Sequence, residues 1–172
     1  MVVSEFKPGE MVVYPTHGVA EMVSVEHREL AGTKAQFYVL KIVESGLKVM
    51  VPVKNAGTVG IRNLVSKEEI DEIYEMLKSR EVPRDNQTWN RRSREYEEKI
   101  NTGSLYEIAE LVRDLRVLGA RKELSFGEKR VLAKAKKRMV KEISTVKKLA
   151  DDVATVEVDT IFADIPLKVP PS

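Results

Sequence analysis

The sequence predicts an α+β fold in which a small β domain precedes a helical domain. Up to Val65 the chain consists of short strand-forming runs broken by turns, and from Ser66 onward apolar residues recur at helical spacing. With 172 residues, 42% of them hydrophobic, the chain can form one sizeable core or two small ones. We therefore expect domains at residues 1–65 and 66–165 and a tail at residues 166–172.

The N-terminal domain is predicted to be a five-stranded, strongly bent β-barrel of the SH3 or Tudor type. Short turns, most of which contain glycine, separate the runs of strand-forming residues. The expected strands are residues 11–15, 18–30, 33–43, 47–53 and 58–65. Alternation along these strands assigns the following side chains to the core: Val12, Val19, Val23, Val25, Tyr38, Leu40, Ile42, Val49 and Val51.

The C-terminal domain is predicted to be a compact bundle of about five helices. Ser66, Ser104 and Ser125 each begin a Ser-x-x-Glu capping box, which marks a helix start. The expected helices are residues 67–79, 89–101, 105–118, 126–149 and 153–163. Each long helix carries one apolar stripe, which predicts packing around a shared core. The proline-rich end, IPLKVPPS, is expected to be frayed.

Charge is distributed unevenly along the helical domain. The segment from Arg121 to Lys148 contains eleven Lys or Arg against three Glu, whereas Asp151 to Asp164 contains five acids and no base. The basic segment is either a solvated helix face or a surface that faces phosphates. A second basic cluster at residues 91–94 favours the phosphate-facing interpretation.

The only tryptophan, Trp89, stands among polar and basic residues in NQTWNRRSREY. If Thr88 and Ser125 are helix caps, Trp89 and Phe126 each occupy the first position of a helix. Such positions attract phosphate, and an aromatic ring there could stack on a base or wedge into a groove. The alternative is that each ring packs over the end of the bundle as an apolar lid.

Sequence patterns for catalysis, cofactors and metals are missing. The chain has no cysteine, its two histidines, His17 and His27, lack a metal-ligand pattern, and no phosphate-binding loop or nucleophile motif is present. We therefore expect a protein that is not an enzyme and binds no cofactor or metal. No apolar run reaches the length of a membrane span, so a cytoplasmic protein without membrane contact is expected.

Several motifs together resemble the CarD/CdnL family of bacterial transcription regulators, which bind RNA polymerase. They are GEMVVYPTHGVAEM, FYVLKI followed by VMVPV, TWNRRSREYEEKI, SLYEIAELVRDL and LSFGEKRVLAKAK. The resemblance runs from about Lys7 to Ile161. The N-terminal half alone also resembles the polymerase-interacting domain of the transcription-repair coupling translocase, whose motor domains this chain has no room for.

The resemblance implies a function and a set of site residues. In the family, the Tudor-like domain docks on the polymerase β subunit, and the helical domain reaches promoter DNA at the upstream edge of the bubble. There a tryptophan enters the minor groove and stabilises the open complex. The matching DNA-binding residues are Trp89, Arg91, Arg92, Arg94, Phe126, Lys129 and Arg130. The matching polymerase-binding residues are Arg28, Lys48, Met50 and Pro52, although relatives can carry a basic residue in place of Met50.

The residues of the docking strand are compatible with this role. In KVMVPV, alternation places Val49 and Val51 on one face and Lys48, Met50 and Pro52 on the other. We expect a monomer that associates with the nucleoid through polymerase and contacts DNA with little sequence specificity, because no residue set suggests a major-groove code. Two alternatives remain: an RNA-binding adaptor with an SH3-like module, and an enzyme with a composite site between the domains.

Overall fold

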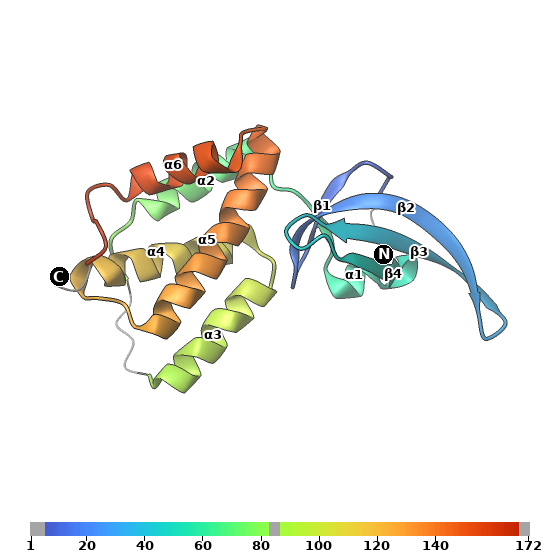
Figure 1. Ribbon diagram of the computed structural model, residues 1–172, viewed down its shortest axis with the longest axis horizontal. Coiled ribbons are helices and arrows are strands. Elements are labelled where there is room, and N and C mark those ends of the chain that lie inside the picture. The colour runs from blue at the N-terminus through green and yellow to red at the C-terminus, as the bar shows by residue number, and fades with distance from the viewer. Residues whose placement is uncertain (1–5, 83–86, 169–172) are drawn as a thin grey trace. The chain divides into compact units, whose positions relative to one another are not determined.

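An antiparallel sheet and a set of helices make up the protein, and they form separate compact units at residues 1–64 and 65–172 (Figure 1). The computed structural model describes residues 6–82 and 87–168. The α+β fold class is confirmed, with the sheet first and the helices after it. Each unit is described by itself.

The sheet has five strands in the order β4-β3-β2-β1-β5. The strands are β1 (Met11–Tyr14), β2 (Gly18–Leu30), β3 (Thr33–Ile42), β4 (Lys48–Pro52) and β5 (Arg62–Asn63). Neighbouring strands pair antiparallel, and β2 and β3 form a long hairpin that extends past the other strands (Figure 1). Strands β4 and β5 stand at the two edges, so the hydrogen bonds of the described residues leave the sheet open.

The main core cluster of the β unit lies on one face of the sheet, and two of the predicted core residues, Val19 and Val23, are not part of it. The buried cluster includes five of the expected residues: Val12, Tyr38, Leu40, Ile42 and Val51. Val19 is also buried, and Val25 and Val49 are partly buried. Val23 was wrongly predicted to be core, since it is 41% exposed. The register shifts between Met22 and Ser24, and this irregularity puts Met22 into the core instead.

The segment predicted as a strand at residues 58–65 is mostly not a strand. A 3-10 turn, η1 (Val53–Asn55), and a short helix, α1 (Ala56–Val59), precede a β5 of two residues. Ala56 is fully buried, and the N–H groups of Gly60 and Ile61 both donate to its carbonyl. Gly60 has a φ of 89°, a conformation that ends the helix and that glycine adopts without strain. Burial of Ala56 thus outweighs the strand preference of the neighbouring residues.

The helical unit contains five longer helices around one core. They are α2 (Lys67–Leu77), α3 (Trp89–Asn101), α4 (Leu105–Arg121), α5 (Phe126–Lys147) and α6 (Asp151–Ile161). All five helices were predicted, and several of their ends differ from the prediction by two or three residues. The hydroxyls of Ser66, Thr88, Ser104 and Ser125 each accept a hydrogen bond from the third backbone N–H of the helix they cap. The helix starts were therefore predicted correctly, although of the three expected capping boxes only the one at Ser125 has both of its hydrogen bonds within the described residues.

The described part of the chain end is mostly exposed but attached to α4, which corrects the expectation of fraying for residues 165–168. Lys168 donates its backbone N–H to the carbonyl of Gly119 at 2.8 Å. Leu167 lies against Gly119 so closely that a Cβ at Gly119 would stand 2.4 Å from Leu167 Cδ2. The absence of a side chain at Gly119 therefore makes room for the returning chain. Residues 169–172, also predicted as frayed, lie outside the described residues.

Candidate nucleic-acid interface and docking strand

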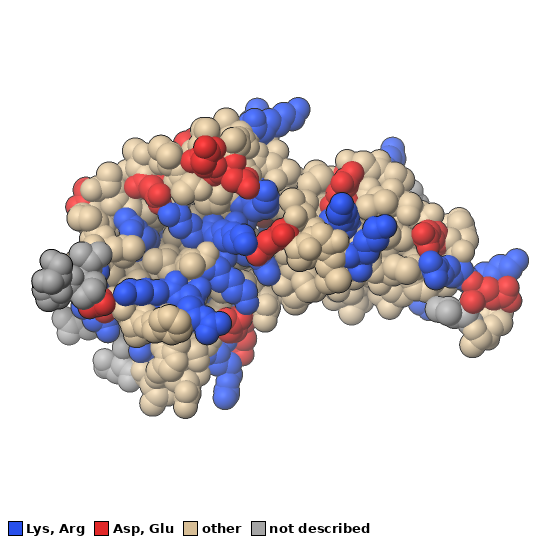
Figure 2. Space-filling view, viewed as in Figure 1, with Lys and Arg blue, Asp and Glu red and all other residues tan. Residues whose placement is uncertain are grey.

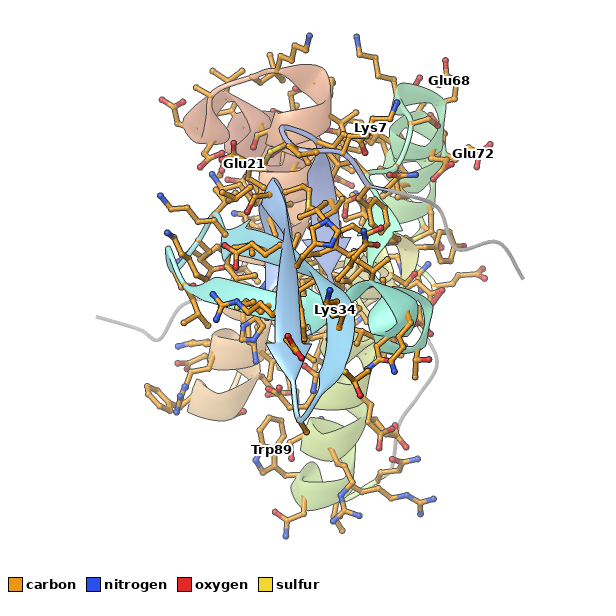
Figure 3. The ribbon with its side chains drawn as sticks, turned by 90° about the vertical axis from the view of Figure 1, so that its right-hand side faces the viewer. Lys7, Glu21, Lys34, Glu68, Glu72 and Trp89 are labelled. Carbon is orange, nitrogen blue, oxygen red and sulfur yellow. The ribbon has the colours of Figure 1, made fainter. Side chains whose placement is uncertain are left out.

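Trp89 and Phe126 occupy the first positions of α3 and α5, as their caps predicted. The two helix starts adjoin one another, and Figure 3 shows the indole of Trp89 beside the first turn of α5. Thr88 and Ser125 each satisfy one backbone N–H of the helix they cap, whereas other first-turn N–H groups have no partner within the helix. Two helix N-termini and two aromatic rings are thereby brought to the same end of the helical unit.

The indole of Trp89 rests on the backbone of Gly127. A Cβ at Gly127 would stand 2.4 Å from Trp89 Cζ2, which is too close for any side chain at this position while the indole stays where it is. Tyr96 packs edge-on against the indole, with 6.3 Å between ring centroids. Trp89 nevertheless remains 36% exposed. The ring is therefore supported on one side and open on another, and it is not part of the bundle core.

Arg92 and Glu128 form an ion pair next to the indole of Trp89. Arg92 Nη1 lies 3.3 Å from Glu128 Oε2, and the Arg92 guanidinium lies 5.6 Å from the centroid of the Trp89 ring. The Glu128 side chain is only 3% exposed, and that of Arg92 is 20% exposed. Arg92 is thus the least solvent-directed of the arginines predicted to contact DNA, because its side chain is engaged within the protein.

Glu128 is held in the ionised form by its surroundings. Burial acts to raise the pKa of Glu128, but two hydrogen bonds with Ser125 and the charges of Lys122 and Arg92 outweigh burial, so that the pKa lies below its usual range. One of these hydrogen bonds runs from the backbone N–H of Ser125 to Glu128 Oε1 at 2.9 Å. The carboxylate thus closes a complete capping box while its other oxygen holds Arg92.

The remaining residues predicted to contact DNA are exposed around these helix starts. Phe126 is 78% exposed, and the guanidinium of Arg130 lies 5.9 Å from its ring centroid. Lys129 pairs with Glu123 at 3.4 Å, with both side chains about half exposed. Arg91 and Arg94 are exposed and form no ion pair with the described residues. We call Trp89, Arg91, Arg94, Phe126, Lys129 and Arg130 the Trp89 surface.

Much of the basic charge of α5 is paired with acids on the neighbouring helices. Lys141 pairs with Asp151 at 2.7 Å and Lys147 with Glu157 at 2.6 Å, both acids of α6. Further pairs join Lys136 to Asp159 and Lys134 to Glu97. Figure 2 shows acidic side chains over α6 and basic ones over α5 beneath it. Three of the five acids in residues 151–164 therefore pair with lysines of the basic segment within the fold.

The four residues predicted to contact polymerase share one face of the sheet. Residues directly opposite each other on paired strands point to the same face. Lys48, Met50 and Pro52 pair with alternate residues of β3, and Arg28 pairs with the next in that series, Ala35. This is the face opposite Tyr38 and the rest of the core. Met50 is 39% exposed, and Arg28 and Lys48 are exposed.

Strand β4 also offers an outward-facing backbone edge. The backbone N–H of Ile42 donates to the carbonyl oxygen of Leu47 at 2.8 Å. In an antiparallel pair, such hydrogen-bonded positions alternate with positions whose backbone N–H and C=O groups point away from the partner strand. Counting from that bond, the backbone groups of Lys48, Met50 and Pro52 point away from β3. Because β4 is an edge strand, these groups face outward from the sheet.

Two parts of this site could not be recognised from the sequence. The contact of Gly127 with Trp89 and the role of Arg92 both depend on the packing of α3 against α5. Arg92 and Glu128, for example, are 36 positions apart in the sequence. The sequence did contain one indication, which is the glycine itself. Glycine lowers helix stability, so a glycine in the first turn of a helix suggests that another part of the protein packs closely against it.

Among residues 6–82 and 87–168, no group of three or more His, Cys, Asp or Glu side chains is arranged to hold a metal ion. Within the same ranges, no helix is both long enough and apolar enough to cross a bilayer.

Comparisons with known proteins match both units. A family model described as the CarD-like/TRCF RID domain matches residues 6–65, and one described as the CarD C-terminal domain matches residues 72–159. The putative transcription factor YdeB of Bacillus subtilis strain 168 is 30% identical over 150 residues, covering 85% of this chain and 95% of that protein.

Solved structures of two N-terminal domains from Myxococcus xanthus are also similar. CdnLNt is 42% identical, with a TM-score of 0.33, over 39% of this chain and 94% of that one. The 72-residue N-terminal domain of CarD is 32% identical, with a TM-score of 0.30, over 37% of this chain and 84% of that one.

Proposed function

The chain belongs to the CarD family of transcription factors, and we propose that it docks on the β subunit of RNA polymerase and stabilises the promoter open complex. In this proposal Trp89 enters the minor groove at the upstream edge of the bubble. The observation that carries it is the placement of the indole, which is supported by Gly127 on one side and exposed on another, beside basic side chains. The role is one of binding, without a catalytic step.

The support beneath Trp89 favours insertion over loose contact. Ordering a flexible side chain on binding costs free energy. The Trp89 ring is already held by Gly127, Tyr96 and Arg92, so it loses less conformational entropy when it binds. An aromatic wedge partly unstacks a base step at a cost of a few kcal/mol, and that cost is lower where the strands are already separating. An upstream bubble edge is such a place, whereas intact duplex is not.

The basic residues of the Trp89 surface would hold the phosphates on either side of the inserted ring. Arg91, Arg94 and Arg130 are suited to this task because no acid in the described residues neutralises them. Lys129 is less suited, since Glu123 competes for its ammonium group. Phe126 extends the apolar contact with the nucleic acid. Contacts of this kind position a protein on DNA and carry little sequence information.

Arg92 has a different role from the other arginines in this proposal. Its guanidinium lies against the indole and is held by the buried carboxylate of Glu128. Only 20% of the Arg92 side chain is exposed, and moving it outward to a phosphate would leave the buried carboxylate of Glu128 without its ion-pair partner, which is costly. We therefore assign Arg92 to positioning Trp89 and the exposed arginines to phosphate contact.

Docking on polymerase would use the outer face of the sheet and the β4 edge. The outward backbone groups of β4 can pair with a strand of the β subunit, and the side chains of Arg28, Lys48 and Met50 add specificity. Methionine adapts its shape to a partner surface. Pro52 lacks a backbone N–H, which limits how far strand pairing extends. A monomer bound in this way would be associated with the nucleoid through polymerase.

Tethering explains how a weak DNA contact could be effective. A small number of phosphate contacts gives low, salt-sensitive affinity for free DNA. Docking on polymerase raises the effective concentration of the Trp89 surface at the promoter. We therefore expect little binding to free duplex and a clear effect on the assembled complex.

The proposal is tested with purified polymerase, a promoter fragment and the full chain. We expect capture of the β subunit by the chain, and slower decay of the open complex after addition of a competitor. Failure to bind the β subunit, or an open-complex lifetime unchanged by the chain, would contradict the proposal. A preference for single-stranded RNA over forked DNA would instead support an RNA-binding adaptor.

A further inference from the structure

A shallow groove lies between α2 and α6, on residues that the Trp89 surface does not use. It has a volume of about 530 Å³ and is lined by Tyr74 of α2 and by Asp152, Val153, Val156, Glu157 and Thr160 of α6. Helices α2 and α6 lie side by side (Figure 1).

Helix α6 has apolar residues on two sides. Ala154 and Val158 are buried in the bundle core, at 0% and 1% exposure. Val153 and Val156, which line the groove, are 47% and 63% exposed. A helix that only closes a bundle needs one apolar stripe. Val153 and Val156 are not needed to close the bundle core, so their side chains are free to contact a partner.

The walls of the groove are acidic. Asp152 of α6 lines the groove and Asp71 of α2 lies close enough to Tyr74 to act on its hydroxyl, and neither aspartate has an ion pair with the described residues. Glu157 pairs with Lys147, whose ammonium group also lies 5.3 Å from the centroid of the Tyr74 ring. The rest of α2 adds negative charge, and Figure 3 shows Glu68 and Glu72 extending outward from it. Burial is the main cause that raises the pKa of Tyr74 to about 12, and the charges of Glu157 and Asp71 act in the same direction.

We propose that this groove binds a basic amphipathic helix of a protein partner. Apolar side chains at i, i+3 and i+4 on the partner would rest on Val153 and Val156, and its Lys or Arg side chains would face Asp71 and Asp152. Helix α6 has 11 residues, so at 1.5 Å per residue it offers about 16 Å, enough for three turns of a partner. Acidic walls disfavour nucleic acid, and the proposal does not depend on the polymerase-docking function.

A designed peptide tests this directly on the full chain. The probe is a labelled 16-residue peptide with leucines at i, i+3, i+4 and i+7 spacing and lysines between them. One control peptide has the same composition in an order that breaks the apolar stripe, and another has Glu in place of Lys. We expect saturable binding of the probe alone, with amide shifts in nuclear magnetic resonance spectra confined to α2 and α6.

Variants locate the binding and complete the test. Val156→Asp should weaken binding about tenfold or more, equivalent to about 1.4 kcal/mol. Tyr106→Asp, at a residue that is 50% exposed on α4, should not change it. The double change Asp71→Asn with Asp152→Asn should reduce the salt dependence of binding, and thermal melts check that each variant is folded. The inference is overturned if the probe does not bind, if the control peptides bind equally well, or if Val156→Asp binds the probe as tightly as the unmodified chain.

Discussion

The indole of Trp89 lies on the backbone of Gly127, and a Cβ at Gly127 would stand 2.4 Å from Trp89 Cζ2. The two residues belong to different helices, so this contact joins the start of α3 to the start of α5. Alanine normally stabilises a helix relative to glycine, by about 1 kcal/mol. Here the missing Cβ is what allows Trp89 to occupy its place.

Replacing Gly127 with alanine should displace the indole. Because Trp89 is the only tryptophan, its fluorescence reports the change directly. We expect Gly127→Ala to increase quenching of Trp89 by acrylamide and to shorten the open-complex lifetime, with β-subunit binding intact. In a Trp89→Ala background, Gly127→Ala should instead stabilise the protein by up to about 1 kcal/mol, because only the helix preference remains. If Gly127→Ala stabilises the protein both with and without Trp89, the contact between Trp89 and the Gly127 backbone is unimportant.

Replacing Trp89 with alanine should separate stability from function. The ring is partly packed, so we expect a loss of unfolding free energy below the roughly 3–5 kcal/mol seen for fully buried aromatic residues. Polymerase binding should be unchanged, and competitor-challenged open complexes should decay faster. Thermal melts and decay assays on one promoter measure both quantities. An open-complex lifetime equal to that with the unmodified protein would refute the wedge.

Arg92 and Arg91 should respond differently to neutralisation. Arg91→Gln removes an exposed charge, so we expect an unchanged melting temperature and a salt dependence of DNA association lowered by about one unit. Arg92→Gln removes the ion-pair partner of the buried Glu128 carboxylate, so we expect a lower melting temperature and altered Trp89 fluorescence. The salt dependence of Arg92→Gln should be close to that of the unmodified protein. If Arg92→Gln lowers the salt dependence as Arg91→Gln does, Arg92 is a phosphate contact.

The capping carboxylate should make stability sensitive to acid. The pKa of Glu128 in the folded protein lies below its usual range, which is near 4.3 in unfolded chains. Its contribution is therefore fully present above about pH 4.3 and is lost as the pH falls through the folded-state pKa. We expect Glu128→Gln to be less stable than the unmodified protein at neutral pH, with the difference shrinking as the solution is acidified. Urea unfolding at a series of pH values measures this, and a difference independent of pH would contradict it.

Met50 should be sensitive to charge but tolerant of apolar replacement. Met50→Asp places a charge in a mostly apolar contact, so we expect weaker binding to the polymerase β subunit while circular dichroism shows an intact fold. Met50→Leu conserves size and apolar character and should retain binding. Equal affinity of both variants would place the docking surface elsewhere on the sheet.

The sequence predicted local features well where a few neighbouring residues decide them. The helix starts at Ser66, Thr88, Ser104 and Ser125 depend on one hydroxyl and a nearby backbone N–H, and each was predicted correctly. The alternation of β4 similarly indicated an exposed Met50. Predictions were wrong where packing overrides local preference. An irregularity in β2 exposes Val23, and α1, which begins at the buried Ala56, takes up the first two residues of the strand expected at 58–65.

The sequence by itself thus determined the order of elements, the helix starts and the position of Trp89 among arginines, because these depend on interactions within a few residues. Only the tertiary structure decided how Trp89 is held and which basic charges stay exposed. Gly127 and Glu128 reach Trp89 and Arg92 only when α5 packs beside α3, and the lysines of α5 meet the acids of α6 only once the bundle has formed. Packing and charge pairing depend on distances between side chains that are far apart in the sequence, and the folded chain alone sets those distances.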